Sequence, residues 1–487
     1  MRIKLLSIFA LLCLAVTSAW ADGECGDGVT WSYAAGTLTI SYSGSGTGAM
    51  ANYGYDNQPW NGNKADITSI VIGSGVTSIG NYAFQSCKNA SLTSITIPAG
   101  VTSIGSMAFY NCTGLTSITI PASVTSIGSL AFRNCSGLTS INVDAANANY
   151  ASEDGALFNK AKTTIIQYSP GKSGTAYTIP ASVTSIDRYA FSDCSNLASI
   201  EIPASVTSIG ESAFYSCSGL TSVSFAPGSQ LTTIGPSAFY ACYNAGLTSI
   251  TIPASVTSIG NSAFNNCSNL ATVTLNSNPV IGTNAFNNIK AGATVTMNLT
   301  ANAAGTDYWM TFYNDGYHFK ADKNTTVYKG KLNGASLELT EVADKIVTKG
   351  NAVILKSTGN PVMTKNSTES TDGYAVGTND LQGTMVDTSK PANCYTLANG
   401  TKGVGFYLYS GTTIHAGKAY LIYTAPSTAR EFVGFGDDET TEIKTTNFTN
   451  YTNEATAEWY DLQGRRISGK PTKKGVYVRN GQKVVIK

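Results

Sequence analysis

The sequence predicts a mostly-β protein: a solenoid of about nine coils with short helical turns, followed by a β-sandwich and a terminal hairpin. The main observation is a segment that recurs every 23 to 25 residues or so between residues 67 and 290. Units of that length gain a core only by stacking on one another, as solenoid coils do. After residue 290 the repeat gives way to short apolar runs separated by turn residues, which is typical of antiparallel sheets.

Residues 1–21 have the composition of a secretory signal peptide. Arg2 and Lys4 give a basic start, residues 5–16 are apolar, and Ala19-Trp20-Ala21 suits cleavage. Cys13 raises lipidation as an alternative, but the bulky pair Leu11-Leu12 precedes it where a lipobox has small residues. The apolar run is too short to span a bilayer. We therefore expect an exported chain with no membrane span after cleavage.

Residues 22–66 are predicted to form an N-terminal cap, because an uncovered solenoid end would expose its core. This segment is rich in Gly, Tyr and Trp. Its residues 37–42 alternate between polar and apolar types, which predicts a half-buried strand.

Each repeat reads as a strand, a second short strand and an Ala-Phe-x-x-Cys segment. Residues 115–124 and 247–256 have the same sequence, LTSITIPASV. In one copy Leu92, Ile95 and Ile97 point inward, and Pro98 ends the strand because it cannot donate to a ladder. The Ala-Phe-x-x-Cys segment is predicted to make a helical turn that places the Phe in the core. These phenylalanines are Phe84, Phe109, Phe132, Phe191, Phe214, Phe239, Phe264 and Phe286.

The interval between Cys135 and Cys194 is longer than one period. Leu157-Phe158 can stand in for Ala-Phe there, and residues 164–168 can stand in for the strand. We count this interval as one extended coil, which brings the total to about nine.

Nine cysteines remain after signal cleavage, and seven of them occupy one position of the repeat. We expect them to serve as small buried apolar residues at a tight corner. Disulfides between coils are disfavoured by the geometry of such a column. A metal site is disfavoured because no His accompanies these cysteines.

The pattern LTSITIPASVTSIGxxAFxxC, the lead-in Cys25-Gly26 and the variant DGALFNKAKTTIIQY resemble the BspA-like leucine-rich repeats of bacterial and protist surface proteins. The resemblance covers roughly residues 22–290. It implies a leucine-rich-repeat-type solenoid, surface display, and attachment to host or matrix proteins or to other cells. It transfers no catalytic residues, because the family shares no active site. The chain lacks the buried Asn ladder of eukaryotic leucine-rich repeats, so a horseshoe curvature is not implied.

Residues 291–436 are predicted to form a β-sandwich, with a hairpin around Asn333-Gly334. Residues 437–457, rich in Asp, Glu, Thr and Asn, are interpreted as a linker. Their acidic run 437–439 suits either a solvated loop or a calcium ligand set, and we favour the loop.

Residues 458–487 form a basic module that ends in a hairpin at Asn480-Gly481. This module resembles the C-terminal modules of exported Bacteroidetes proteins and is similar to type IX sorting domains. An ordinary closing hairpin is the alternative.

Charge and motifs argue against several function classes. The 31 Lys and Arg nearly balance the 30 Asp and Glu, which argues against nucleic acid as a partner. Residues 212–289 contain no Asp, Glu, Lys, Arg or His, so that part of the solenoid offers nothing for general acid–base catalysis. The only histidines, His318 and His415, accompany no hydrolase or metalloprotease motif. We predict no enzyme activity and no cofactor, with a hidden hydrolase as a remote alternative.

The position directly after the repeated Phe varies most between copies, and a variable position along a stack is a candidate binding edge. It holds Tyr110, Arg133, Tyr215 and Tyr240, and Tyr and Arg are enriched in interface hot spots. The alternative is an aromatic ladder that only covers the side of the coils. The predicted function is recognition of an external protein or glycan at the cell surface. Two further readings stay open: a component of surface glycan capture, and a spacer that presents a binding sandwich.

Overall fold

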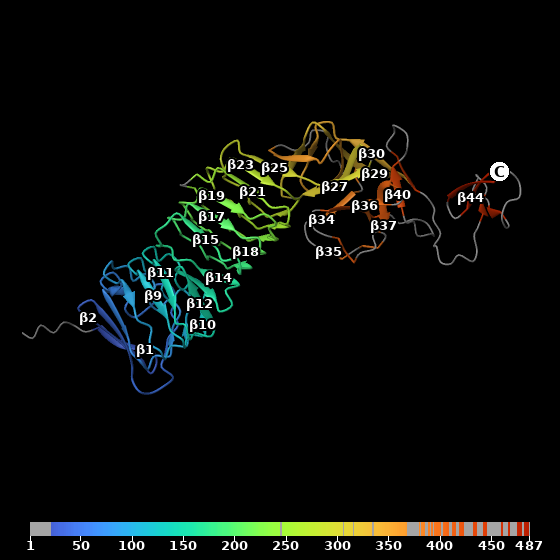
Figure 1. Ribbon diagram of the computed structural model, residues 1–487. Coiled ribbons are helices and arrows are strands. Elements are labelled where there is room, and N and C mark those ends of the chain that lie inside the picture. Colours follow the sequence, from blue (N-terminus) through green and yellow to red (C-terminus); the bar gives the residue numbers. More distant parts are fainter. Residues whose placement is uncertain are drawn as a thin grey trace, which may run out of the picture. The chain divides into compact units, whose positions relative to one another are not determined.

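The computed structural model divides into two compact units, Met1–Val295 and Thr296–Lys487 (Figure 1). It describes residues 21–367 except 244, 245, 305, 315, 334 and 335, and beyond them 379, 381–384, 388–389, 391–392, 394–400, 403–408, 412–414, 418–422, 432–435, 442–445, 459–460, 466–467, 475–479 and 482–486. Most of the predicted signal peptide, the acidic run 437–439 and His415 therefore lie outside the described residues. No helix in the described part of the chain is long and apolar enough to cross a membrane.

The N-terminal cap converts an antiparallel sheet into the parallel stack of the solenoid. Its elements are β1 (Ala21–Asp27), β2 (Val29–Ala34), β3 (Thr37–Tyr42), β4 (Ala49–Met50) and the 3-10 helix η1 (Asn61–Asn63). Strands β1, β2 and β3 pair antiparallel, and β3, which has the predicted bounds 37–42, pairs parallel with the first repeat strand. Trp60 is fully buried and stacks on Phe84 at 6.1 Å between ring centroids, so it covers the end of the repeat core.

Each coil, meaning one turn of the solenoid, contributes two short strands, and most of these strands pair parallel and in register with the same strands of the next coil. Within a first strand such as Ser117–Ile120, Ile118 and Ile120 are buried, as predicted for the apolar positions, and Thr119 is exposed. The first strands are β5 (Ser69–Ile72), β7 (Ser94–Ile95), β9 (Ser117–Ile120), β11 (Ser140–Val143), β15 (Ala176–Thr178), β17 (Ser199–Ile202), β19 (Ser222–Phe225), β21 (Ser249–Ile252) and β23 (Thr272–Leu275). The second strands are β6 (Ser78–Ile79), β8 (Ser103–Ile104), β10 (Ser126–Ile127), β14 (Thr164–Gln167), β16 (Ser185–Ile186), β18 (Ser208–Ile209), β20 (Thr233–Ile234), β22 (Ser258–Ile259) and β24 (Val280–Ile281).

The third side of each coil is not the predicted helical turn. In the coil of Phe109, the bonds Tyr110 N–H to Met107 O (3.1 Å) and Cys112 N–H to Phe109 O (3.3 Å) close two successive tight turns. Met107 and Asn111 have φ values of 55° and 61°, which a right-handed helix excludes. The physical reason is that the Phe109 N–H donates to Ala131 O of the next coil at 2.9 Å. A helix would use that group within its own coil.

The repeated phenylalanines form a buried aromatic column. Phe84 stacks on Phe109 at 5.5 Å, and Phe214 stacks on Phe239 at 4.9 Å with an interplanar angle of 1°. Such pairs contribute about 0.5–1.5 kcal/mol each beyond the burial of their area. The column therefore provides both the core and the vertical register of the coils.

The repeated cysteines are buried and free, which confirms their predicted apolar environment. They also do something that the sequence did not predict: their thiols donate hydrogen bonds from one coil to the preceding one. The Cys112 Sγ lies 3.0 Å from Phe84 O, and the Cys217 Sγ lies 2.9 Å from Phe191 O. The same bond is made by Cys135, Cys242 and Cys267.

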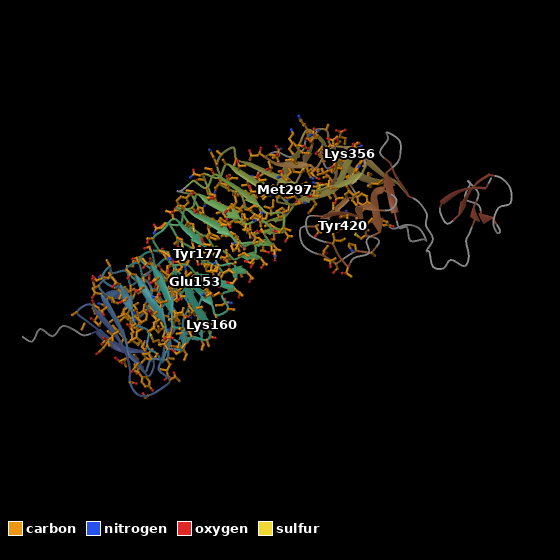
Figure 2. All side chains as sticks on the ribbon, viewed as in Figure 1. Glu153, Lys160, Tyr177, Met297, Lys356 and Tyr420 are labelled. Atoms are coloured by element: carbon orange, nitrogen blue, oxygen red, sulfur yellow. The ribbon has the colours of Figure 1, made fainter. Side chains whose placement is uncertain are left out.

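An antiparallel meander interrupts the coils midway along the first unit, where Glu153 and Lys160 lie (Figure 2). It consists of β12 (Tyr150–Glu153), β13 (Ala156–Asn159) and β14, and β14 then pairs parallel with β16 as a second strand. The assignment of Leu157-Phe158 to the Ala-Phe position is wrong. Tyr168 takes the Phe position instead: it stacks on Phe191 at 5.3 Å, and its N–H donates to Ala190 O at 2.7 Å. Phe158 is buried on the antiparallel strand β13.

The second unit consists of antiparallel sheets, which confirms the fold class predicted for this region. Phe312 and Phe319, on strands of its two larger sheets, meet edge to face at 5.8 Å. Its strands up to residue 422 are β26 (Asn302–Ala304), β27 (Asp307–Asn314), β28 (His318–Ala321), β29 (Thr325–Asn333), β30 (Ser336–Glu341), β31 (Ile346–Val347), β32 (Asn351–Ser357), β33 (Val362–Asn366), β34 (Leu381–Thr384), β35 (Thr388–Ser389), β36 (Cys394–Gly400), β37 (Gly403–Leu408), β38 (Thr413–Ile414) and β39 (Lys418–Ile422), and β25 (Thr294–Asn298) spans the boundary of the units.

Both predicted hairpins of the second unit form. Strands β29 and β30 pair with Asn333 opposite Ser336, and β44 (Gly475–Arg479) pairs with β45 (Gln482–Ile486). Part of the predicted linker is a strand, because β41 (Glu442–Thr445) pairs with β30 and with β40 (Phe432–Phe435). The remaining strands are β42 (Trp459–Tyr460) and β43 (Arg466–Ile467).

The buried thiols predict a loss of stability in alkali. Burial raises the pKa of Cys87 and of Cys135 from 9.0 to about 12. Unfolding at high pH therefore releases protons, and the contribution of these thiols to stability is complete below pH 9 and lost as the pH rises towards 12. We expect the urea concentration at the unfolding midpoint to decrease as the pH is raised from 9 towards 12. The decrease should be smaller in the variant Cys87→Ala/Cys135→Ala. A midpoint with the same pH dependence in both proteins would contradict this expectation.

The thiol hydrogen bond predicts unequal costs for two matched substitutions. Cys217 and Cys194 occupy the same repeat position and are both buried, but the Cys194 thiol donates only a longer bond of 3.7 Å, to Ser192 O of its own coil. Cys217→Ala is expected to lower the free energy of unfolding by about 0.5–1.5 kcal/mol more than Cys194→Ala, the net value of one hydrogen bond. Urea unfolding measures both costs, and equal costs would show that the thiol acts only by filling space.

A candidate binding edge on the solenoid

The residues that follow the repeated Phe are held in line by bonds between coils. In six of the coils the N–H group two residues after the repeated Phe donates to the carbonyl of the residue that follows the next Phe; these coils are those of Phe84, Phe109, Phe191, Phe214, Phe239 and Phe264. Examples are Asn111 N–H to Arg133 O at 2.9 Å and Asp193 N–H to Tyr215 O at 2.8 Å. Side chains at this position therefore lie one above another along one edge of each uninterrupted stack.

Tyr215 and Tyr240 meet on this edge, as the sequence predicted for residues of one register. Their rings stack at 5.3 Å with an interplanar angle of 4°, and both side chains are partly exposed. The Asn266 amide of the next coil donates to the Tyr240 hydroxyl at 2.8 Å. This hydrogen bond and the stacking fix the positions of both rings, so the exposed surface of the Tyr215–Tyr240 pair is preorganised.

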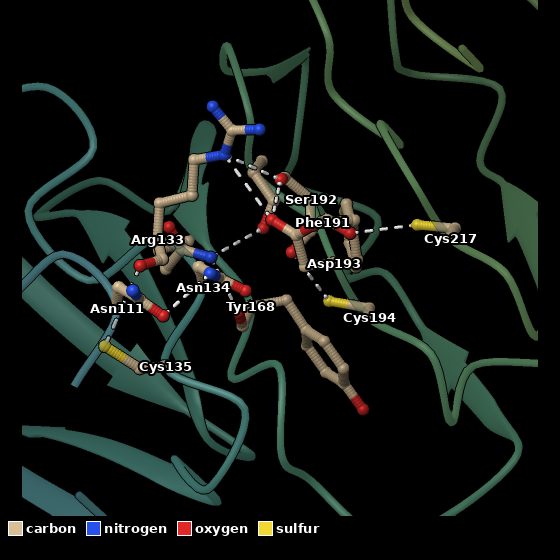
Figure 3. A network of polar contacts seen from close by, with 12 residues as sticks. Asn111, Arg133, Asn134, Cys135, Tyr168, Phe191, Ser192, Asp193, Cys194 and Cys217 are labelled. Carbon is tan, nitrogen blue, oxygen red and sulfur yellow. Dashed lines mark hydrogen bonds and ion pairs between the residues drawn. The ribbon is translucent and has the colours of Figure 1, made fainter. Parts of the chain in front are cut away.

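Arg133 joins the same cluster from across the meander. Figure 3 shows its side chain beside Ser192 and Asp193. Its Nε donates to Ser192 Oγ at 3.2 Å and to Asp193 Oδ2 at 3.4 Å. Its guanidinium carbon lies 4.5 Å from the ring centroid of Tyr189 and 5.0 Å from that of Tyr215. The Arg133 side chain is only 18% exposed, so this residue holds the two parts of the solenoid together as well as contributing to the edge.

Tyr110 does not join this cluster through its side chain. It lies one coil before Arg133 and is partly exposed, and its main chain takes part in the coil-to-coil ladder through Ser86 N–H at 2.8 Å. Among the described residues its ring contacts no other ring or cation at stacking distance. The structure thus brings together three of the four predicted residues.

Sequence reasoning missed three charged or aromatic neighbours of the cluster. The ring of Tyr189 makes cation–π contacts with both Arg133 and Arg188. The guanidinium carbon of Arg188 lies 5.4 Å from the ring centroid. Asp193 is the ion partner of Arg133. Tyr189 lies two residues before Phe191, at a position that also varies between copies. This variation was the only feature of the sequence that could have identified Tyr189. We define the tyrosine–arginine edge as Arg133, Arg188, Tyr189, Asp193, Tyr215 and Tyr240.

The chemistry of this edge suits binding. It offers stacked phenol faces and guanidinium groups. Arg133 uses its Nε in its hydrogen bonds, and its two terminal nitrogens point away from Ser192 and Asp193 in Figure 3. No cluster of His, Cys, Asp and Glu side chains that could hold a metal ion occurs among the described residues. His318 accepts a hydrogen bond from the Lys349 N–H at 3.3 Å, a structural contact outside the solenoid.

The bridging role of Arg133 predicts a stability difference between two arginines. Arg133→Gln removes a partly buried ion pair and two cation–π contacts, and should cost about 1–2 kcal/mol of unfolding free energy. Arg188 pairs with Glu211 at 3.5 Å with both side chains about half exposed, so Arg188→Gln should cost less than about 0.5 kcal/mol. Urea unfolding of both variants measures the difference. Arg133→Gln with wild-type stability would show that the bridge is dispensable.

Comparison with known proteins identifies the repeat. The family model described as the BspA type leucine rich repeat region matches in six copies, over residues 62–173 and 168–293. No curated protein matches the chain.

Several solved structures are similar to this chain. A leucine rich cell surface protein from Faecalibacterium prausnitzii is 22% identical, over 57% of this chain and 95% of that chain, with a TM-score of 0.39. A leucine-rich repeat protein from Eubacterium ventriosum is 27% identical, over 56% and 96%, with a TM-score of 0.34. The pneumococcal vaccine antigen PcpA is 19% identical, over 55% and 88%, with a TM-score of 0.40. From the six matched copies it follows that the solenoid of this chain is a leucine-rich repeat region of the BspA type.

Proposed function

We propose that this chain is an exported surface protein that binds an external protein through the tyrosine–arginine edge. The observation that carries the proposal is that Arg133, Tyr215 and Tyr240, from three different coils, form one continuous stack of rings and guanidinium. The predicted signal peptide and the BspA-type repeats support export and surface display.

The physical case rests on preorganisation. Side chains whose positions are already fixed lose little conformational entropy on binding, so their contacts contribute more to affinity. Tyr and Arg are the residue types that most often dominate interfaces. The free terminal nitrogens of Arg133 suit a carboxylate or a main-chain carbonyl of a partner.

The test is binding of the mature chain, residues 22–487, to an array of extracellular-matrix proteins and glycans. The variant Tyr215→Ser/Tyr240→Ser removes two rings of the edge. Tyr243→Ser is a matched control, because Tyr243 is 45% exposed in a neighbouring position but lies outside the edge. We expect the double variant to weaken binding to the matched protein by at least about tenfold, or roughly 1.4 kcal/mol, and the control to leave it unchanged.

Two outcomes would contradict the proposal. A protein ligand bound equally by the wild type and the double variant would move recognition away from the edge, as in a spacer that presents the second unit. An array in which no protein binds would remove the adhesive role itself.

A further inference from the structure

A groove of about 590 Å³ lies on the strand face of the solenoid, between β19 and β21. It contains none of the residues of the tyrosine–arginine edge. Its walls come from residues 221–226, 228–229, 249–251 and 253–255, together with Asn276. Ligand sites in proteins commonly have a volume of about 300–1,000 Å³, and this groove falls in that range.

The groove exists because the parallel ladder is broken at this point. Thr221 N–H donates to Ala198 O and Ala271 N–H donates to Thr248 O, both at 2.8 Å, which is the usual bond between successive first strands. The equivalent bond from Thr248 N–H to Thr221 O is absent, and β19 and β21 belong to different sheets.

A sequence feature accounts for the break. Leu247 follows Cys242 by five residues, whereas Leu220 follows Cys217 by three. The extra residues lie directly before β21, the strand whose ladder with β19 is missing. The same spacing recurs between Cys87 and Leu92, and there too the flanking strands β5 and β7 belong to different sheets.

One hydroxyl group that lines the groove has no hydrogen-bond partner. In the other coils the Ser of the Pro-Ala-Ser-Val segment donates to a carbonyl of the preceding coil, for example Ser205 Oγ to Val183 O at 2.7 Å. The Oγ of Ser255 occupies the same position, lines the groove, and is buried with no hydrogen-bond partner. A buried hydroxyl without a hydrogen-bond partner is destabilising, so a ligand that supplies a partner gains affinity.

The groove also presents one aromatic ring. Phe225 occupies a strand position that holds Ile120, Ile202 and Ile252 in other coils, and all three of those side chains are fully buried. Phe225 is instead partly exposed and lines the groove. Its ring can pack against an apolar ligand face.

The groove carries no charge. Its walls are lined by hydroxyl groups such as those of Ser224, Ser249 and Thr251, and residues 212–289 contain no Asp, Glu, Lys, Arg or His. A charged ligand would lose hydration here without gaining an ion partner. A ligand with many neutral hydrogen-bonding groups and a flat apolar face has no charge whose hydration would be lost. We propose that the groove between β19 and β21 binds a neutral saccharide.

The test is calorimetric titration of the mature chain with short malto-, cello-, xylo-, manno-, galacto- and chito-oligosaccharides. Acidic oligosaccharides and an uncharged Ser- and Thr-rich peptide are titrated alongside. Phe225→Ile installs the residue that other coils carry, and Ser224→Trp fills the groove from an exposed position. Thr119→Trp is the matched control, because Thr119 is exposed at the equivalent position of β9, whose ladder with β11 is intact.

We expect at least one neutral oligosaccharide to bind, with affinity lowered about fivefold or more by Phe225→Ile and abolished by Ser224→Trp. Thr119→Trp and Tyr215→Ser/Tyr240→Ser should leave this binding unchanged, which separates it from the function proposed for the edge. The proposal is overturned if no neutral oligosaccharide binds. It is equally overturned if the peptide or an acidic glycan binds better, or if Ser224→Trp, folded as judged by its thermal transition, still binds.

Discussion

The peptide of the repeated Phe is the point on which the rest of the first unit depends. In the coil of Phe214 its N–H donates to Ala238 O of the next coil at 2.7 Å. Its carbonyl accepts the Cys217 N–H at 3.3 Å and the Cys242 thiol at 3.3 Å, and its ring lies 4.9 Å from that of Phe239. One residue thus sets the spacing and the register of two adjacent coils and contributes its ring to their shared core. Because each coil stabilises only its neighbours, such local bonds decide whether the stack holds.

Interruptions of this regular stack coincide with the sites that we propose. The meander of β12, β13 and β14 separates Phe132 from Tyr168, and Arg133 reaches across that interval to Asp193 and Tyr215. The longer spacing before β21 occurs where the ladder between β19 and β21 is missing and where the groove lies. An uninterrupted ladder presents a uniform hydroxyl surface, so departures from the repeat are where distinct side-chain chemistry can be exposed.

Much of the fold could be predicted from the sequence because the repeat is nearly literal. The strand at residues 37–42, the inward Ile118 and the burial of the cysteines all follow from periodicity and composition. Phe158 was placed wrongly because Leu157-Phe158 matches the local pattern, whereas the choice of Tyr168 depends on how the meander pairs. The left-handed φ values of Met107 and Asn111 depend on bonds to neighbouring coils. Periodicity carries no information about such bonds.

The candidate site was predictable in its register but not in its contacts. Residues at one repeat position were expected to align, and Tyr215 and Tyr240 do. The hydrogen-bond partners of Arg133 lie 59 and 60 residues further along the chain, beyond any local pattern.

The central claim is that coil-to-coil bonds at the repeated Phe hold the stack together, and its most direct test is amide hydrogen exchange of the whole chain. The N–H groups of Phe109, Phe191, Phe214 and Phe239 should be among the slowest to exchange, with faster exchange in residues 144–163. Phe amides that exchange as fast as those of the connecting turns would contradict the coil-to-coil bonding on which the structure depends.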